Sequence, residues 1–328
     1  MHRWTRRDVV IGSGVAASAL ALPRMAQAAP AGFPNKNIQF VIPYAPGGGF
    51  DVYPRVVAPV MEKYLPNKVN IVPINVPSGG GSRGVAQLYR AKPDGYTIGI
   101  LNIPGMFILQ QQQGAAAYDL AKFSWIGAMG EGERYVIAAG SKSPLKTFAD
   151  LKALSAKRPV KLSVTGPEGT AYAATMIGSR LLDLKIQLIT GYKGSADYVV
   201  AAIRGDSDAV IAAIPTATRF VRGGTIRVLA SFETHSSFPG VPDATALGQP
   251  DLDNISVERV IAGPPGIPAD IQNTLSIALA KALADPIVVK WAKDNDLIMR
   301  SRTPQGTAQL VAQQRVFFDK WKKYLIAS

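Results

Sequence analysis

The sequence predicts an α/β fold made of two lobes. Short apolar runs alternate with glycine-rich turns and with runs of helical periodicity, and a second set of such units begins near Tyr135. Strands that alternate with helices form parallel β-α-β units. The 328 residues also give enough chain for two lobes of ordinary size. We therefore expect each lobe to hold a mainly parallel sheet flanked by helices.

The first set of elements begins with an apolar run that leads into three consecutive glycines, Gly47, Gly48 and Gly49. Hydrophobic periodicity distinguishes the strands from the helices in this part of the chain. The expected strands are 38–44, 69–76 and 96–101, and the expected helices are 52–65 and 84–90.

The second set of elements is followed by a return to the first lobe and by a helical end. Its expected strands are 135–139, 161–164, 186–189, 209–213 and 227–231, and its expected helices are 147–155, 169–182, 196–204 and 215–222. The expected final elements are a Pro- and Gly-rich loop at 238–250, the returning strand 257–263, and the helices 269–284, 286–295 and 304–327.

The N-terminus predicts a cleavable export signal. Arg6 and Arg7 precede a moderately apolar run at 9–22, and small residues that suit cleavage end at Ala28. The arginine pair is typical of a twin-arginine signal, and an ordinary secretory signal is the alternative. The apolar run is too short to remain as a membrane span. We therefore expect a periplasmic protein that consists of residues 29–328.

Composition excludes several kinds of site. Lys and Arg number 36 against 23 Asp and Glu, and loss of residues 1–28 would leave a net charge of +10. The basic residues are dispersed without a nucleic-acid-binding module, so the positive field either favours small anions or reflects an ordinary solvated surface. The chain has no cysteine, and His235 would be the sole histidine after cleavage. Glu131 and Glu133 lack a cluster of partner acids, so we interpret them as solvated hinge or cleft-edge residues and expect neither a metal nor a cofactor.

The glycine-rich turns predict an anion-binding cradle. In an α/β sheet, ligands bind at the carboxyl ends of the strands, where helix N-termini present free N–H groups. Glycine lets the backbone approach a ligand, and the N–H groups together with the helix dipole bind an anion. The alternative is that these glycines only form tight turns. Asp51, in the first turn of the following helix, complements the helix dipole.

The second glycine turn contains two motifs that suggest enzymes. Residues 79–84 satisfy G-x-G-x-x-G, but Pro77 interrupts the strand end and no convincing acidic residue follows about 20 positions on. Residues 80–84 satisfy G-x-S-x-G, which would make Ser82 a nucleophile with His235 as its base. A secreted serine hydrolase therefore remains the alternative function, although His235 lies in a polar loop.

An ordered series of short motifs carries a family resemblance. The motifs are VIPYAPGG at 41–48, PSGGGSRG at 77–84, KPDGYT at 92–97, YKGSA at 192–196, GDSD at 205–208, PGVP at 239–242 and PPGIP at 264–268. In this order they resemble the solute receptors of tripartite tricarboxylate transporters, the Bug-type periplasmic binding proteins. The resemblance covers essentially the whole mature chain.

The resemblance implies a type II periplasmic-binding-protein clamshell whose chain crosses between the lobes twice. The first lobe would comprise residues 33–134 and 256–328, and the second lobe residues 135–255. Backbone groups and ordered water at the glycine turns would hold a carboxylate. The ligand-binding residues implied in the first lobe are Tyr44, Ala45, Gly48, Gly49, Phe50, Ser78, Gly79, Gly80, Ser82, Asn102 and Ile103. Those implied in the second lobe are Gly169, Thr170, Tyr172, Tyr192, Ser195 and Asp208.

Departures from the family pattern leave the identity of the acid open. Phe50 replaces the commoner threonine and makes that wall more apolar, and Tyr172 would contact the ligand or pack between the lobes. Arg83 would pair with a second carboxylate or face water. Asp208 would face the cleft or act as a structural acceptor. The implied function is capture of a small organic acid and its delivery to integral-membrane transporter subunits, by a monomer that catalyses no reaction.

Overall fold

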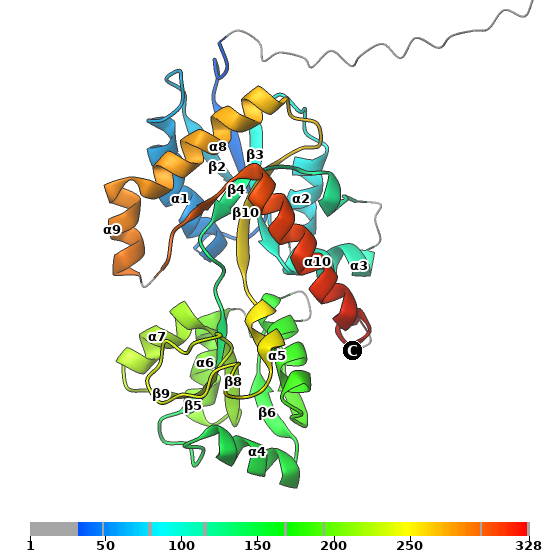
Figure 1. Cartoon of the computed structure of the whole chain (residues 1–328), viewed down its shortest axis with the longest axis vertical. Helices are drawn as coiled ribbons and strands as arrows, with labels where there is room; N and C mark the ends of the chain where they lie inside the picture. Colours follow the sequence, from blue (N-terminus) through cyan, green and yellow to red (C-terminus); the bar gives the residue numbers. More distant parts are fainter. Residues whose placement is uncertain are drawn as a thin grey trace, which may run out of the picture.

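The computed structural model describes residues 32–47, 49–77, 81–113, 117–166, 169–192, 194–295 and 297–326. These residues form two α/β lobes that are stacked along the long axis of the molecule (Figure 1). One lobe contains a six-stranded sheet and the other a five-stranded sheet. The predicted two-lobed α/β fold is therefore confirmed, whereas the export signal at 1–28 lies outside the described residues.

The first lobe is a sheet covered by helices on both faces. Its strand order is β11-β4-β10-β3-β1-β2, with β1 at Ile38–Ile42, β2 at Ile71–Asn75, β3 at Thr97–Ile103, β4 at Ser124–Met129, β10 at Glu258–Gly263 and β11 at Ser301–Arg302. One face packs against α1 (Gly49–Glu62), α8 (Ala269–Ala284) and α9 (Pro286–Asp294). The other packs against α2 (Ser82–Tyr89), α3 (Gly105–Gln113) and α10 (Pro304–Ile326). Because strand side chains alternate between faces, Ile100 joins the first core and Leu101 the second.

The second lobe has one continuous core. Its strand order is β7-β6-β8-β5-β9, with β5 at Tyr135–Gly140, β6 at Val160–Ser163, β7 at Ile186–Ile189, β8 at Ala209–Ala213 and β9 at Ile226–Ser231. Its helices are α4 (Phe148–Lys157), α5 (Thr170–Leu181), α6 (Ser195–Arg204) and α7 (Ile214–Arg222). Short 3₁₀ helices occur at Leu120–Lys122 (η2) in the first lobe and at Pro250–Asn254 (η3) before β10.

Both sheets are mixed, but most strands of each run in one direction, as expected for mainly parallel sheets: β1 to β4 in the first lobe and β6 to β9 in the second. The pairs β1–β2, β1–β3, β6–β7 and β6–β8 are parallel. Strand β10 runs antiparallel to β3 and β4, and β5 runs antiparallel to β8 and β9. Strand β5 is the first strand after the chain crosses into the second lobe, and β10 is the first strand after it returns to the first lobe. Each of these strands begins at the junction between the lobes and runs away from it. The neighbouring strands of the β-α-β units end at that junction, so the two kinds of strand are antiparallel.

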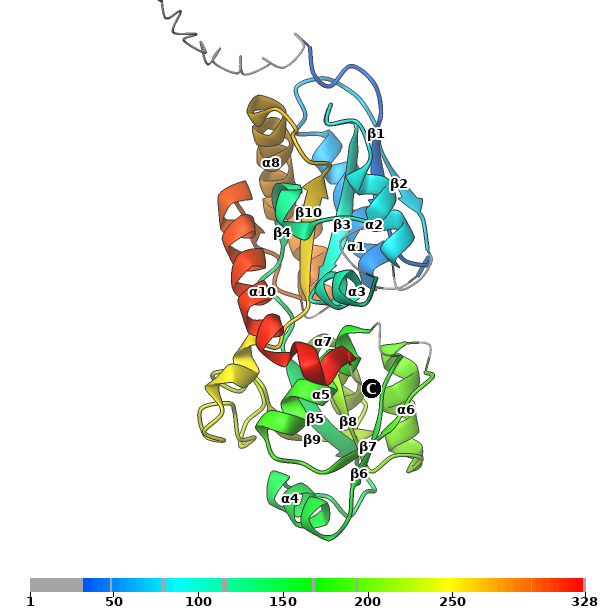
Figure 2. The ribbon, with the colours of Figure 1, turned by 90° about the vertical axis from the view of Figure 1, so that its right-hand side faces the viewer.

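Three segments connect the lobes. The chain crosses from β4 to β5 and returns through η3 to β10, and Glu133 and Val257 exchange backbone hydrogen bonds of 3.1 and 3.0 Å between these crossings. Helix α10 begins against the first lobe and ends against the second, where Phe317, Phe318 and Leu325 join the second core (Figure 2). Within the described residues, no helix combines the length and apolar character needed to span a membrane.

Candidate functional site

A cavity of about 560 Å³ lies between the two lobes. The first lobe contributes the start of α1, Arg259 of β10 and the segment around the end of α9. The second lobe contributes the starts of α5, α6 and α7 together with Arg219. Residues of both lobes therefore line the same cavity, as a binding site between lobes requires.

Four helix N-termini border this cavity, those of α1, α5, α6 and α7. Gly169, Gly194 and Ala213 occupy the N-cap positions of the three helices in the second lobe, and none of them has a side chain that could cap the first turn. The first-turn N–H groups of a helix lack i−4 partners within the helix, and they carry the positive end of its dipole. Helix α7 offers fewer such donors, because its Ile214 N–H donates to the Arg134 carbonyl and Pro215 has no N–H group. The arrangement therefore favours an anion in the cavity.

The charged side chains that line the cavity do not change the sign of this field. Arg219 and Arg259 are cationic, and Asp197 and Glu133 are anionic. Because the two kinds are equal in number, their net charge is zero, and the converging helix N-termini add a preference for negative charge.

A network inside the first lobe shapes the first glycine turn. The Gly47 N–H donates to Asp51 Oδ2 over 2.9 Å, and Asn75 Nδ2 donates to both Asp51 Oδ1 (2.8 Å) and the Tyr44 carbonyl (2.9 Å). The Arg55 Nε group donates to Asp51 Oδ1 over 2.9 Å. These bonds, that from Arg55 foremost, lower the pKa of Asp51 to about 2. The carboxylate thus holds the turn before any ligand arrives.

A buried ion pair forms the floor of the cavity. Arg259 is 9% exposed and donates from Nη1 to Glu133 Oε1 over 2.6 Å and from Nη2 to Glu133 Oε2 over 3.2 Å. The hydroxyl of Tyr53 donates to Glu133 Oε1 over 2.8 Å. Burial opposes the charge of Arg259, but Glu133 together with Tyr53 and Tyr135 outweighs it, so the pKa of Arg259 is raised and the guanidinium stays charged.

Polar atoms beside this floor lack partners within the described part of the chain. They are Tyr44 Oη, Asn102 Oδ1 and Arg259 Nε, and all three are buried. Asn102 pairs with Arg259 across β3 and β10, and the Tyr44 ring packs 4.9 Å from that of Phe50. Burial raises the pKa of Tyr44, which keeps its hydroxyl protonated. Buried polar atoms without partners are rare in native proteins, and bound water or a ligand commonly satisfies them.

The family of the chain follows from comparison with known proteins. The model of the tripartite tricarboxylate transporter family receptor matches residues 53–326. The chain belongs to this receptor family. The family and its structural neighbours are solute-binding proteins and not enzymes.

Two solved structures and one relative illustrate how far the similarity extends. Protein BugT of Bordetella pertussis is 28% identical over 326 residues, with 94% of each chain covered. MatC of Rhodopseudomonas palustris with bound malate has a TM-score of 0.73 at 22% identity, over 89% of this chain and 100% of that one. An R. palustris protein with adipate has a TM-score of 0.74 at 20% identity, over 90% of this chain and 98% of that one. At these identities the two structures show a shared fold.

The receptor brings part of the predicted site together. Gly49, Phe50, Thr170 and Ser195 line the cavity from both lobes. Tyr44 and Asn102 lie beside its floor, and Gly169 is the N-cap of α5. The predicted residues Gly48, Ser78, Gly79 and Gly80 lie outside the described residues.

Other predicted residues are not among those that line the cavity. Ala45 is exposed on the first glycine turn, and Ser82 begins α2 in a half-buried position. Ile103 is buried in the first lobe and Tyr172 in the second, and Tyr192 packs against the core of the second lobe. The burial of Tyr172 agrees with a packing role more than with stacking on a ligand.

Asp208 has a structural role. Its carboxylate accepts hydrogen bonds from Arg158 Nη1 and Nη2 at 2.7 and 2.8 Å and from the Lys161 N–H at 2.8 Å. It therefore ties the start of β8 to the start of β6 and is absent from the cavity lining. Arg83 is exposed on α2, which is the alternative in which this side chain faces water.

The structure does not bring together the serine and the histidine that the alternative serine hydrolase would need. Ser82 belongs to α2 in the first lobe, whereas His235 follows β9 in the second lobe. His235 lines a second cavity of about 490 Å³, which shares the floor residues Tyr53, Glu133 and Arg259 with the first cavity. Ser82 lines neither cavity. Across the described residues, no group of three or more His, Asp or Glu side chains is arranged to hold a metal.

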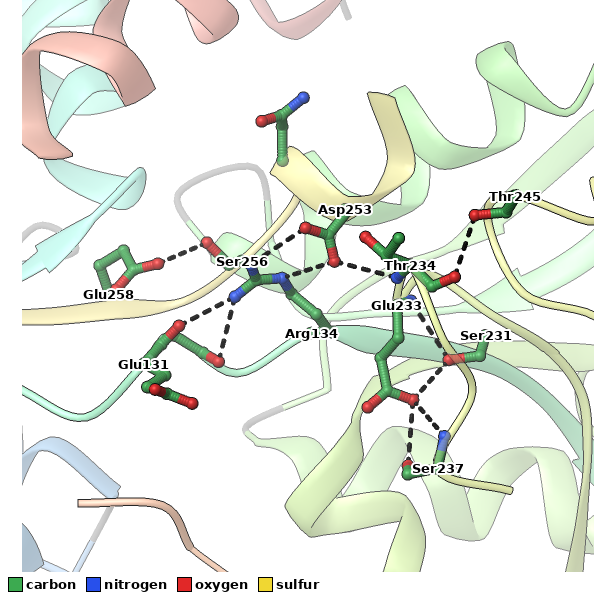
Figure 3. A network of polar contacts seen from close by, with 12 residues as sticks. Glu131, Arg134, Ser231, Glu233, Thr234, Ser237, Thr245, Asp253, Ser256 and Glu258 are labelled. Atoms are coloured by element: carbon green, nitrogen blue, oxygen red, sulfur yellow. Dashed lines mark hydrogen bonds and ion pairs between the residues drawn. The ribbon is translucent and has the colours of Figure 1, made fainter. Parts of the chain in front are cut away.

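A polar network joins the two crossings on the side of the second cavity (Figure 3). Arg134 donates from Nε and Nη2 to the Asp253 carboxylate at 3.1 and 3.2 Å and from Nη1 to the Glu131 carbonyl at 2.9 Å. Nearby, Ser256 Oγ donates to Glu258 Oε1 over 2.7 Å, and burial raises the pKa of the Glu258 carboxyl. The two crossings are therefore linked by side chains as well as by backbone.

Sequence reasoning missed the floor of the cavity. It interpreted Glu133 as a solvated hinge or cleft-edge residue and did not consider Arg259, Tyr53 or Arg219. A signal for Arg259 was present, because Glu258 and Arg259 introduce two charges into a run that otherwise reads as a buried strand.

Proposed function

We propose that this receptor captures a small organic acid between its lobes in the periplasm and delivers it to the membrane subunits of a tripartite transporter. The observation that supports this most strongly is the convergence of the α1, α5, α6 and α7 N-termini on one cavity. Backbone N–H groups of this kind bind a carboxylate without a reactive side chain. Residues 1–28 would direct export, and the receptor would act as a monomer.

Capture would proceed by closure of the lobes on the acid. The proposed lobes are residues 33–134 with 256–328 and residues 135–255, and they would rotate about the crossings near Glu133 and Val257. A ligand that contacts both lobes binds the closed state more tightly than the open state and so shifts the population towards closure. The closed form would then be the one that the membrane subunits recognise.

The bound ligands of the structural neighbours narrow the choice of test compounds. Malate and adipate are bound by proteins of the same fold, so aliphatic dicarboxylates are the first candidates. Phe50, Tyr53 and Trp291 also line the cavity, which suits an acid with an apolar or aromatic body. We therefore expect the ligand to be a carboxylate whose non-polar part packs on these rings.

A thermal-shift screen of residues 29–328 tests the proposal. The panel contains malate, adipate, citrate, benzoate and amino acids, each at several concentrations, with the matching neutral amides as controls. A ligand present at a hundred times its Kd stabilises the folded state by about 2.7 kcal/mol, which raises Tm by several degrees. We expect at least one acid to raise Tm while its amide does not.

The screen is repeated after partial unfolding and refolding, which removes any acid that was purified with the protein. If no carboxylate changes Tm in either preparation, the proposed function is wrong.

A further inference from the structure

Arg259 has the location that a charge-selecting residue needs. It is the second residue of β10, next to the crossing, and it lines the cavity between the lobes although only 9% of it is exposed. Its Nη2 atom lies 3.3 Å from the position that a Cβ atom on Gly49 would occupy. Gly49 is the first residue of α1, so the guanidinium lies directly behind one of the four helix N-termini.

The side chain of Arg259 is fixed on several sides. Its guanidinium carbon lies 4.8 Å from the centroid of the Phe50 ring and 4.3 Å from that of the Tyr53 ring. Glu133 accepts from both terminal nitrogens, and Tyr53 holds Glu133 in turn. Such cation–π and bidentate contacts orient a planar guanidinium. The positive charge is therefore preorganised at the floor of the cavity.

The contribution of the Arg259–Glu133 ion pair to folding stability does not explain its presence. Replacement of a buried ion pair by apolar side chains is often neutral or stabilising, because desolvation of the charges offsets their attraction. Arg259 Nε is also buried without a hydrogen-bond partner in the described part of the chain, which adds to the cost. Stability of the junction between the lobes therefore does not by itself account for an arginine here.

We propose that Arg259 makes the receptor select anionic ligands over neutral ligands of the same shape. This inference rests on the proposed function. A carboxylate at the N-terminus of α1 lies closer to the guanidinium than an acid elsewhere in the cavity, and the low-polarity surroundings strengthen the attraction. Glu133 is the counter-ion that keeps Arg259 in place in the empty receptor and moderates its attraction for the ligand.

The two charges make opposite contributions, which gives the test its direction. Arg259→Gln leaves Glu133 to repel the acid, so we expect its Kd to rise about tenfold or more. Glu133→Gln leaves Arg259 without its counter-ion, so we expect the Kd of the same acid to fall about threefold. The Kd of the matching amide changes little in both variants. A purely structural ion pair would instead weaken acid and amide together in both variants.

The experiment is calorimetric titration of malate, adipate and benzoate, and of their neutral amides, into the natural protein and its variants. Arg158→Gln is the matched control, because Arg158 forms a similar two-nitrogen pair with Asp208 away from both cavities. We expect this control to keep the natural ratio of acid to amide affinity. The double variant Arg259→Gln/Glu133→Gln leaves neither charge unpaired, and we expect it to lower the ratio of acid to amide affinity to the level that the helix N-termini alone provide, even where a single variant fails to fold.

Each outcome separates this inference from the proposed function. If the natural protein binds an acid and Arg259→Gln or the double variant keeps the natural acid-to-amide ratio, the role of Arg259 is wrong and the receptor function stands. Shifts of the acid Kd in the same direction in Arg259→Gln and Glu133→Gln also contradict the inference. Failure of the natural protein to bind any of the acids overturns both.

Discussion

Asp51 shows how one residue connects the fold of the first lobe to its site. It lies at the third position of α1, is 3% exposed, and accepts hydrogen bonds from Gly47, Arg55 and Asn75. The sequence predicted a favourable interaction with the helix dipole. It did not predict the bond to Asn75, which lies 24 residues later and reaches Asp51 only because β1 and β2 are adjacent. The same carboxylate therefore lies in the first turn of α1 and shapes the turn before it.

Asp51→Asn tests this role through the pH dependence of stability. The folded-state pKa of about 2 lies below the ordinary value of 3.8, so the unfolded chain binds the proton more tightly. The stabilisation by Asp51 is therefore fully present above about pH 4 and is lost as the pH falls towards 2. We expect the variant to reduce the free energy of unfolding by about 2 kcal/mol at pH 7, and the difference to vanish near pH 2.

Urea denaturation from pH 2 to 7 measures this difference. Asp294→Asn is the control, because the pair of Asp294 with Lys290 lies at the surface, where such pairs contribute little. A pH-independent effect of Asp51→Asn would show that the carboxylate charge does not stabilise the turn.

At the scale of elements, the local sequence pattern was sufficient to predict most helix and strand boundaries. It was insufficient to predict the direction in which each strand runs within its sheet. The strands 186–189 and 209–213 and the helix 269–284 have the predicted bounds, because turn residues and periodicity mark them locally. The sequence did not predict α3 or β4. Nor did it predict that β5 and β10 run antiparallel to their neighbours, since that depends on the path of the chain between lobes. The floor of the cavity was missed for the same reason, because Glu133 and Arg259 lie 126 residues apart.

Gly84 lets α2 pack directly against the end of β1. A Cβ atom at this position would lie 2.8 Å from Pro43 Cα and 3.0 Å from the Val76 carbonyl oxygen, and backbone cannot yield as a flexible side chain would. We therefore expect Gly84→Val to lower the free energy of unfolding by about 1–3 kcal/mol through overpacking. Chemical denaturation measures the change.

Gly194→Ala is the matched control for Gly84→Val. Its φ of −169° is extended backbone and nothing lies within 4 Å of the added Cβ, so we expect its stability to stay within about 0.5 kcal/mol of the natural protein. Equal stability of Gly84→Val and the natural protein would mean that α2 does not need this close approach.

At the scale of the whole molecule, closure predicts a change in the distance between lobes. The chain has no cysteine, so two introduced cysteines can be spin-labelled without background. We expect labels at Lys36→Cys in the first lobe and Lys152→Cys in the second to approach each other when the acid that raises Tm is added. The reason is that a ligand bound by both lobes favours the closed population. Pulsed electron–electron double resonance between the two spin labels measures the distribution of distances between the lobes.

A pair within one lobe provides the control for closure. Lys36→Cys and Lys290→Cys both lie in exposed positions of the first lobe, and we expect their distance to stay constant. An unchanged distribution between the lobes at saturating acid would contradict a hinge mechanism for this receptor.

The path of α10 determines how the molecule would respond to tension. The described chain begins at Gly32 on the first lobe. Its other end, in α10, packs against the second lobe, where Leu325 is buried (Figure 1). A force that pulls these two ends apart therefore passes through the two crossings and the last helix. A ligand that joins the lobes would bear part of the load, so the occupied receptor would extend less than the empty one under the same pull. The stiffness of a single receptor, measured between these two ends, would therefore report whether that molecule holds a ligand.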